Sequence, residues 1–483
     1  MLSAQPRIHR GNRLPSADTI YALASGLGKS AIAVLRLSGP GCDAAVAALT
    51  GKADLPDRAA VYTPLRHPAT GEILDRALVL RFAAPRSYTG EDMLELQVTG
   101  GRAVVHDVLS VLAGLKGFRP AEPGEFALRA FENGKVDLTE VEGLADLVDA
   151  ETSAQRRQAV RIAGGALRRE ADEIRASVLK ATAAIDALLD FSDIDDAEDF
   201  ADQEFRQHVT RARGKIRAAL DGSLQIRKLR EGFTIVLAGP PNAGKSTLMN
   251  ALSRQEASIV SAIPGTTRDV IEVALDLGGY PVVLVDTAGI RDSDDSIEAE
   301  GVRRALMRVH NADLVLWLSE SDTFEMHPEI AAPATLRVRT KVDAVMPGLV
   351  PGIHVATIQD HFRTSTWMAG TSPAMTEEAV VASPIAVSAL TGAGVPELLA
   401  TLQRYAETAL APASHSLITR ERHKLAFRQA DASLESALEI GLSVPELAGE
   451  ELRRAARCLE RVAGRISVED VLDEIFSSLC VGK

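Results

Sequence analysis

Short apolar runs near the N-terminus predict the first strands of the chain. Residues 31–37 and 77–82 are apolar runs of the kind found in strands, and 93–98 alternates apolar and polar positions, as a half-buried strand does. A helix is expected over 104–115, after a pair of glycines. Together these elements predict an α+β module.

The next part of the chain has the spacing of amphipathic helices. Apolar residues recur at this spacing over 138–150 and over 152–189, where the pattern fits one long helix or two. The acidic stretch 190–202 is expected to form a turn or short linker, and another helix is expected over 204–230. Since these helices have no core partner upstream, we expect them to pack against helices nearer the C-terminus.

Helical spacing returns at the end of the chain, over 420–440, 445–463 and 468–479. Between the two helical regions the pattern changes to short apolar, β-branched runs, which are typical of buried strands. An α/β domain inserted into an all-α domain is therefore expected. The four runs are 233–238, 280–285, 314–318 and 385–387.

Composition narrows the class of protein. At 483 residues, two to four domains are expected, and 46% hydrophobic with 25% charged residues is typical of a soluble globular protein. The net charge of −13 argues against a surface that is positive throughout, although a local basic face can still bind nucleic acid. There are three cysteines, too few and too widely spaced to form a framework of disulfides. With no apolar signal segment and no membrane span apparent in the sequence, a cytoplasmic location and no membrane partner are expected.

Arginines gather on the segment 152–189. Two interpretations stay open: a basic helix face that binds RNA phosphates, or an ordinary solvated surface, which is the commoner case. The arginines are Arg156, Arg157, Arg161, Arg168 and Arg169.

The strand 233–238 leads into a glycine-rich loop with the pattern G-x-x-x-x-G-K-[ST], followed by a helical segment. This context predicts a phosphate-binding loop, in which Gly239 and Gly244 let N–H groups curl around a phosphate at a helix N-terminus. Lys245 is expected to reach the β- and γ-phosphates, and the Ser246 hydroxyl to bind Mg²⁺. The predicted nucleotide-binding residues of the loop are Asn242, Ala243, Gly244, Lys245, Ser246 and Thr247.

Two motifs downstream are typical of a nucleotide switch. In 263–269, Thr267 is the candidate for binding Mg²⁺ and sensing the γ-phosphate. The strand 280–285 runs into D-x-x-G, where the first carboxylate should hold the Mg²⁺ shell and the glycine N–H should meet the γ-phosphate. Ile290 follows this motif, so no glutamine stands there to orient water, and hydrolysis needs another device. The motif consists of Asp286, Thr287, Ala288 and Gly289.

A fourth motif selects the base. Residues 340–343 fit [NT]-K-x-D, in which the Asp343 carboxylate can accept from guanine N1–H and the 2-amino group, a donor pair that adenine lacks. Four ordered motifs therefore predict GTP as the nucleotide. Thr340 stands where asparagine is commoner, and we expect it to loosen the anchoring of the phosphate loop modestly. The base-binding candidates are Thr340, Lys341, Asp343, Ser388, Ala389 and Leu390.

Stretches at both ends of the chain resemble one family. In the N-terminal module they are 35–39, 87–92, 123–126 and 129–138, and the chain ends in Cys480-Val481-Gly482-Lys483, like the family's Cys-x-Gly-Lys terminus. The chain thus resembles the MnmE (TrmE) family of tRNA-modification GTPases. The resemblance leaves out 345–384, which is longer than the usual connection and is treated as an insertion.

The resemblance implies a second ligand. In that family the N-terminal module binds a 5-formyltetrahydrofolate-type one-carbon donor and forms the homodimer. The implied folate contacts are Arg36, Glu95, Lys135 and Lys483, with Cys480 near the reaction; Arg and Lys can pair with carboxylates, and Glu can accept from a pterin N–H edge. Without the resemblance, Arg36 and Glu95 would be interpreted as solvated strand residues. The family's His-Gly-Gly is Thr99-Gly100-Gly101 here, so a role for the imidazole is in question.

The resemblance also supplies a device for hydrolysis, because the loop asparagine and the Gly-Thr-Thr-Arg switch are similar to those of K⁺-dependent GTPases. It makes Glu298 the residue that orients the attacking water through a second water. With Lys245 and Cys480, Glu298 completes the implied catalytic residues. The residues assigned to K⁺ are Asn242, Ser261, Ile263 and Thr266.

The predicted organisation is an α+β N-terminal folate-binding and dimerisation domain (1–133), an all-α helical domain in two parts (134–230 and 411–483), and an inserted α/β P-loop GTPase domain of Ras-like type (231–410). The resemblance implies modification at C5 of the wobble uridine of certain tRNAs, adding an aminomethyl-type (carboxymethylaminomethyl) group together with a flavoprotein partner, MnmG (GidA), in a heterotetramer or larger assembly. The chain itself has no G-x-G-x-x-G after a strand, the usual mark of FAD binding.

Two other functions stay open. A regulatory GTPase switch in ribosome assembly or stress signalling would have the same phosphate loop, but would lack the folate pocket and the C-terminal motif. A folate enzyme with a vestigial G domain is disfavoured by the intact nucleotide motifs. The sequence specifies neither the tRNAs that are substrates nor the amine donor.

Overall fold

The computed structural model describes residues 18–26, 28–190, 197–240, 242–255, 272–286, 310–321, 334–343, 384–411, 417–464 and 482. The chain divides into two compact units. Unit 1 is Met1–Ala145 with Glu460–Lys483, and unit 2 is Asp146–Leu459. The three domain boundaries predicted from the sequence, after residues 133, 230 and 410, stay predictions.

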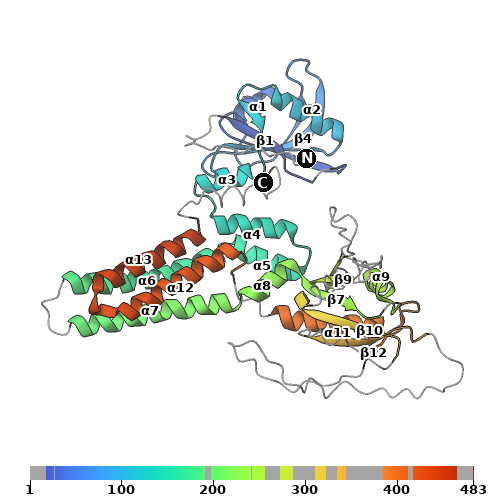
Figure 1. Ribbon diagram of the computed structural model, residues 1–483. Coiled ribbons are helices and arrows are strands. Elements are labelled where there is room, and N and C mark those ends of the chain that lie inside the picture. Colours follow the sequence, from blue (N-terminus) through green and yellow to red (C-terminus); the bar gives the residue numbers. More distant parts are fainter. Residues whose placement is uncertain are drawn as a thin grey trace, which may run out of the picture. The chain divides into compact units, whose positions relative to one another are not determined.

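Unit 1, of which the N-terminal part is blue in Figure 1, is built on a six-stranded sheet. The strand order is β3-β4-β5-β2-β1-β6, and all neighbours are antiparallel except β1 and β6. Alternate strand residues such as Leu35, Leu37, Leu94 and Leu96 form one core with the helices α1 and α2. The opposite face packs in part on Phe126 of α3. The elements are β1 (Thr19–Leu23), β2 (Ile32–Ser38), α1 (Cys42–Thr50), β3 (Val61–Arg66), β4 (Ile73–Phe82), β5 (Met93–Thr99), α2 (Arg102–Ala113), β6 (Phe118–Pro120), α3 (Glu125–Glu132) and the beginning of α4 (Leu138–Asp149).

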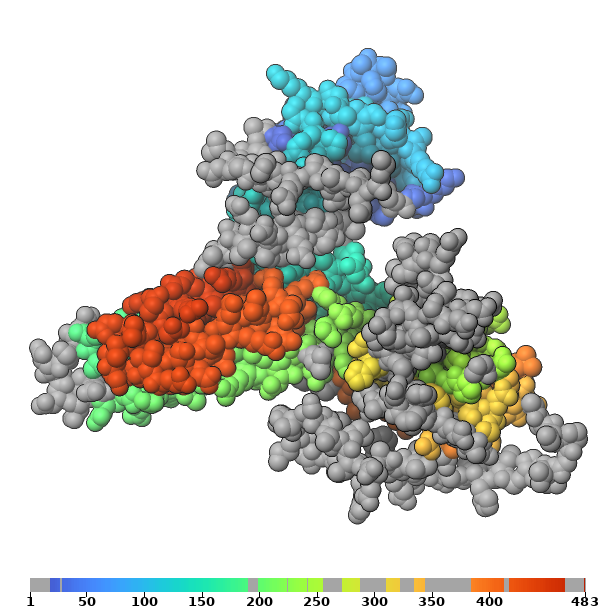
Figure 2. Space-filling view, viewed as in Figure 1, coloured from blue at the N-terminus to red at the C-terminus, as the bar shows by residue number. Residues whose placement is uncertain are grey.

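The helical part of unit 2 joins segments that are far apart in the sequence. α6 and α7 pack along each other, and α12 lies on α7, where Arg213 pairs with Asp431 at 2.9 Å. Figure 2 shows α12 and α13, in orange and red, side by side along this bundle. The expected packing against C-terminal helices is confirmed. The elements are α5 (Ser153–Ala163), α6 (Ala166–Asp190), α7 (Ala197–Asp221), α8 (Ser223–Glu231), α12 (Glu421–Ile440), η2 (Gly441–Ser443) and α13 (Pro445–Val462).

Two sequence predictions in this region were wrong. The stretch 190–202 is not all linker, because α7 begins at Ala197; acidic residues such as Asp199 suit the first turn of a helix, where the helix dipole favours negative charge. The expected helix over 204–230 is two helices, α7 and α8, which meet at Gly222, a residue with low helix propensity. Over 152–189, where one helix or two were expected, the structure has two, separated by Gly164 and Gly165.

The nucleotide-domain part of unit 2 holds the second sheet, in the order β12-β11-β10-β7-β9-β8. All neighbours are parallel except β8 and β9. Central strands such as β10 are buried along their whole length, because α9 and α11 pack on the sheet. The elements are β7 (Phe233–Ala238), α9 (Lys245–Gln255), β8 (Glu272–Leu277), β9 (Tyr280–Asp286), β10 (Leu314–Ser319), β11 (Thr335–Arg339), β12 (Ile385–Ala386) and α11 (Val395–Leu410).

The predicted fold class, an α+β region, an all-α region and an α/β P-loop region, is confirmed. Among the residues described, every helix is too short or too polar to span a bilayer.

Candidate functional site

The phosphate loop connects the end of β7 to the start of α9. Its backbone takes left-handed or extended positive-φ conformations at Gly239 (φ 146°), Asn242 (φ 65°) and Gly244 (φ 83°). A Cβ at Gly239 would lie 2.4 Å from the Leu318 carbonyl oxygen, so only glycine lets the loop pass β10. The local sequence therefore builds the strand–loop–helix geometry that its pattern predicts.

Lys245 points back into this loop. Its Nζ donates hydrogen bonds to the carbonyl oxygens of Gly239 and Pro240, each at 2.9 Å. Burial lowers the pKa of Lys245 from its ordinary value, and the charge of Asp286 opposes that change. The amino group is thus held where the loop motif requires a cation for phosphate.

Ser246 and Asp286 meet although they lie on different elements. β9 runs beside β7, with Asp286 in register with Leu237, so the end of β9 reaches the start of α9. The Ser246 hydroxyl donates to Asp286 Oδ2 at 2.6 Å, and Asp286 is buried. A hydroxyl and a carboxylate are hard oxygen donors, which fit Mg²⁺. The geometry brings together the two predicted Mg²⁺ residues that fall in the described part of the chain.

The base motif is tied directly to the phosphate loop. Thr340, at the end of β11, is buried, and its hydroxyl donates to the Ala243 carbonyl oxygen at 2.8 Å. Its backbone N–H donates to the Ser319 carbonyl oxygen, also at 2.8 Å. We expected threonine to loosen the loop modestly; this hydrogen bond shows that an anchor is present. Lys341 adopts a φ of 57° and pairs with Glu320. Asp343, two residues further along the same turn, is exposed.

The neighbouring loop follows β12. The buried Ser388 accepts a hydrogen bond from the Thr391 N–H at 3.1 Å through its hydroxyl, and its own N–H donates to the Ala393 carbonyl oxygen at 2.9 Å. The Val342 N–H donates to the Val387 carbonyl oxygen, which links this loop to the base motif. Leu390 is 84% exposed, so its side chain is accessible at the rim. The base-binding residues thus come from two adjacent parallel strands.

Several predicted residues lie outside the described residues, and their roles stay predictions. They are Ser261, Ile263, Thr266, Thr267, Thr287, Ala288, Gly289, Glu298, Cys480 and Lys483. The proposed insertion 345–384 also falls there, except for its last residue.

In unit 1 a second cluster surrounds Arg36. Arg36 and Glu95 are register partners on β2 and β5, and the Arg36 Nε and Nη2 donate to Glu95 Oε1 at 3.1 and 3.0 Å. The guanidinium also lies over the ring of Tyr88, 5.7 Å from its centroid, and over Phe126. Its Nη1 donates to the carbonyl oxygen of Gly482 at 3.3 Å. Gly482, the penultimate residue of the chain, therefore contacts a predicted folate residue.

Lys135 borders the same cluster through the 87–92 loop. A Cβ at Gly90 of that loop would lie 3.0 Å from Lys135 Cε, so the lysine stem runs along the loop that carries Tyr88. Thr99, which replaces the family's histidine, donates its hydroxyl and N–H to Asp75 at 3.2 and 2.6 Å. Asp75 therefore fixes Thr99 at the end of β5.

Sequence reasoning missed a charge network beside this cluster, centred on Arg129. Arg129 is buried, and its guanidinium contacts Glu91 at 2.9 Å, Asp18 at 3.1 Å and Glu125 at 3.5 Å. Glu91 also accepts from the Ser38 hydroxyl at 2.7 Å. Burial acts to raise the pKa of Glu125, but hydrogen bonds from Arg119 and the Glu122 backbone outweigh it and the pKa is lowered. The motif 123–126 with Arg129 was the available signal, although no role was assigned to it.

Comparison with known proteins finds family matches in both the N-terminal module and the rest of the chain. A family profile described as the MnmE helical domain matches residues 138–480, and one described as the GTP-binding protein TrmE N-terminus matches 19–135. The tRNA modification GTPase MnmE of Azorhizobium caulinodans is 46% identical over 97% of this chain and 99% of its own. The protein of the same name from Methylobacterium sp. (strain 4-46) is 47% identical over 96% and 100%.

The chain belongs to the MnmE family of tRNA modification GTPases.

Among solved structures, the G domain of the T. maritima FeoB iron transporter matches 36% of this chain and 98% of its own, with 23% identity and a TM-score of 0.24. MnmE membership therefore rests on the sequence comparisons. It confirms the resemblance stated from the motifs, and it agrees with a phosphate loop, a guanine-type base motif and a separate N-terminal module in one chain.

Proposed function

We propose that this chain hydrolyses GTP in order to modify the wobble uridine of certain tRNAs. The observation that carries hydrolysis is the contact between Ser246 and Asp286 beside the loop-held Lys245. The observation that supports modification chemistry is the Arg36–Glu95 pair with the chain's end against it, which a simple nucleotide switch does not need.

At the nucleotide site the residues have separate tasks. Lys245 exchanges its two carbonyl acceptors for β- and γ-phosphate oxygens. Ser246 and Asp286 hold the Mg²⁺ shell, and bound Mg²⁺ supplies positive charge against the phosphates. Asp343 accepts from the guanine edge. Thr340 keeps the phosphate loop and the base motif in one rigid frame through its bond to Ala243.

For hydrolysis we propose K⁺ stimulation. Asn242 is exposed at the top of the loop, where its side-chain oxygen is accessible as a ligand. Ser261, Ile263 and Thr266 would complete the ion's shell, and Glu298 would orient the attacking water. GTP turnover should then be several-fold faster in KCl than in NaCl at equal ionic strength; equal rates in the two salts would remove the K⁺ assignment.

The N-terminal module is proposed to bind the folate one-carbon donor through Arg36, Glu95, Lys135 and Lys483, close to Cys480. Arg36 suits this role because Glu95 and the Tyr88 ring fix its guanidinium, so little side-chain entropy is lost on binding a carboxylate. The flavoprotein MnmG is the proposed partner for the redox part of the chemistry, and a cytoplasmic location is part of the same proposal.

A homodimer through the N-terminal module is also part of the proposal. The sheet face that carries Arg36 and Glu95 exposes large apolar side chains, with Tyr62 at 65% and Leu78 at 38%. These two residues are neighbours across β3 and β4. An apolar patch of this kind on a sheet is what a second copy of the chain would cover.

The first experiment is mass spectrometry of tRNA nucleosides from cells that lack this protein. We expect loss of the C5 aminomethyl-type wobble uridines, restored by the wild type and not by Lys245→Ala or Cys480→Ser. Unchanged wobble uridines would refute the modification role and would favour a regulatory GTPase switch instead.

A further inference from the structure

The arginines of the helical region separate into two groups by their contacts. Arg168 lies 3.7 Å from Asp172, and Arg169 donates to the Gly164 carbonyl oxygen at 2.7 Å. The other arginines of the group all lie on α5 and are exposed, and their guanidinium groups make no hydrogen bond or ion pair with the part of the chain that the structure describes. They are Arg156, Arg157 and Arg161.

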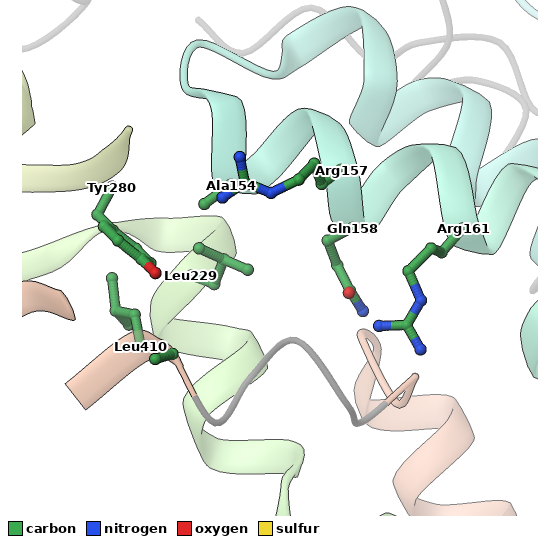
Figure 3. Close-up of a pocket in the computed structure, with 8 residues that line it drawn as sticks. Ala154, Arg157, Gln158, Arg161, Leu229, Tyr280 and Leu410 are labelled. Carbon is green, nitrogen blue, oxygen red and sulfur yellow. The ribbon is translucent and has the colours of Figure 1, made fainter. Parts of the chain in front are cut away.

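A hollow of about 140 Å³ opens beside these arginines. Figure 3 shows Arg157 and Arg161 on its α5 side, Tyr280 and Leu410 on the other, and Leu229 between them. One wall is therefore cationic, and the opposite wall is an aromatic ring on an apolar floor. This volume is well below the roughly 300 Å³ at which sites for whole drug-sized ligands begin, so it suits one ring or one sugar-phosphate unit.

We propose that this hollow binds the base of one unstacked nucleotide of the tRNA. The base packs on the Tyr280 ring above Leu229 and Leu410, and Arg157 and Arg161, one helical turn apart at the exposed side of the hollow, hold the phosphates that flank the base. Arginines beside an aromatic ring are the combination by which proteins bind single-stranded RNA, because the cations pair with the backbone and the ring stacks on any base. The inference rests on the proposed action on tRNA and adds the place where the RNA is held.

The charge distribution favours RNA binding at this local cationic face over attraction to the protein surface as a whole. The chain as a whole carries a formal charge of −13, so RNA needs a local positive patch in order to approach. Burial raises the pKa of Glu170 of α6, and the charge of Arg161 is among the charges that oppose this change. The cations of α8, which contacts α5, are already paired: Arg227 and Arg230 each lie 3.5 Å from Glu231, and Lys228 pairs with Asp313.

The hollow lies away from the nucleotide site. Tyr280 is the first residue of β9, and Asp286, which contacts Ser246, is the last. At about 3.3 Å per residue, the strand separates them by roughly 20 Å. Substitutions at the hollow should therefore leave GTP turnover unchanged when tRNA is absent.

The test is binding of bulk tRNA to the full-length protein over a series of salt concentrations. The double variant R157E/R161E should bind at least about five-fold more weakly, and the slope of log K against log salt should fall by about 1.5 to 2, because two phosphate contacts are lost. Tyr280→Leu should weaken binding without changing this slope, and Tyr280→Phe should bind as the wild type does. The melting temperature and the GTP turnover without tRNA report that each variant is folded.

The matched control is R211E/R428E, which makes the same change of charge at exposed positions on α7 and α12. Wild-type affinity in R157E/R161E, or an equal loss in the control, would overturn the inference and leave the arginines as a solvated surface. Absence of tRNA binding by the wild type, together with unchanged wobble uridines in the deletion strain, would refute the proposed function itself.

Discussion

At the scale of single residues, Thr340 links the base motif to the phosphate loop, a contact that its motif alone does not predict. Its buried hydroxyl is the donor that joins the base motif to the phosphate loop, at 2.8 Å from the Ala243 carbonyl oxygen. Thr340→Ala removes that donor and leaves the carbonyl oxygen without this partner, at a cost of about 1–3 kcal/mol. We expect a lower melting temperature and a several-fold higher KM for GTP. Thr340→Ser keeps the hydroxyl and should stay close to the wild type; equal loss in both variants would show that the methyl group, not the hydrogen bond, matters.

The buried thiol of Cys42 makes the stability of the protein depend on pH. Burial, with smaller contributions from Asp92 and Asp43, raises the pKa of its thiol above the ordinary value. The folded state thus keeps a proton that the unfolded state releases near pH 8.5, so this contribution to stability is complete below about pH 8.5 and declines as pH rises above it. Native Cys42 should resist iodoacetamide at pH 8.5 and react after unfolding in urea. Rapid labelling of the native protein, detected by mass spectrometry, would contradict the buried thiol.

At the scale of elements, the Arg129 network holds together the 87–92 loop, α3 and the start of β1. Arg129→Met leaves Glu91, Glu125 and Asp18 close together without the central cation, and breaking a buried pair of this kind costs about 3–5 kcal/mol. We expect the free energy of unfolding of unit 1 to fall by that amount in urea titrations. Arg86→Met is the control, since Arg86 is 72% exposed and pairs only at the surface. A loss no larger than the control's would mean that the network contributes little to stability.

The stability that the Arg129 network contributes should also depend on pH in the acid range. Because the pKa of Glu125 is lowered in the folded state, its contribution is present above its unfolded pKa of about 4.3 and is lost as pH falls through the folded value. The stability difference between the wild type and Arg129→Met should therefore shrink below about pH 4.3.

The elements also show what the sequence could and could not predict. Long periodic helices and the strand before the phosphate loop were found because their apolar spacing repeats over many residues. β3 was missed because Pro64 interrupts it, and proline is tolerated there only because β3 is an edge strand. The nucleotide-binding residues could be predicted because their motifs are local in the sequence. The Arg129 network could not be predicted, since its carboxylates come from positions as far apart as Asp18 and Glu125, and only the fold brings them together.

At the scale of the whole molecule, the two proposed ligand sites lie in separate compact units. The nucleotide residues belong to unit 2, whereas Arg36, Glu95 and the chain's last residues belong to unit 1. We propose that a dimer through the sheet of unit 1 links the two activities. That sheet face would then have two roles, since Tyr62 and Leu78, the apolar residues proposed to contact a second subunit, lie on the same face as Arg36 and Glu95.

This arrangement leads to a prediction about assembly. Tyr62→Glu with Leu78→Glu places charges at the centre of the exposed apolar patch, where a second subunit would bury them without partners. Light scattering should show a shift from dimer to monomer, and folate binding should weaken with it because the proposed folate residues Arg36 and Glu95 lie on the same face. Leu179→Glu, at a position 45% exposed on α6, should leave the dimer intact. A double variant that stays dimeric would place the dimer contact on another surface, and one that becomes monomeric with unchanged folate affinity would show that a single subunit forms the whole pocket.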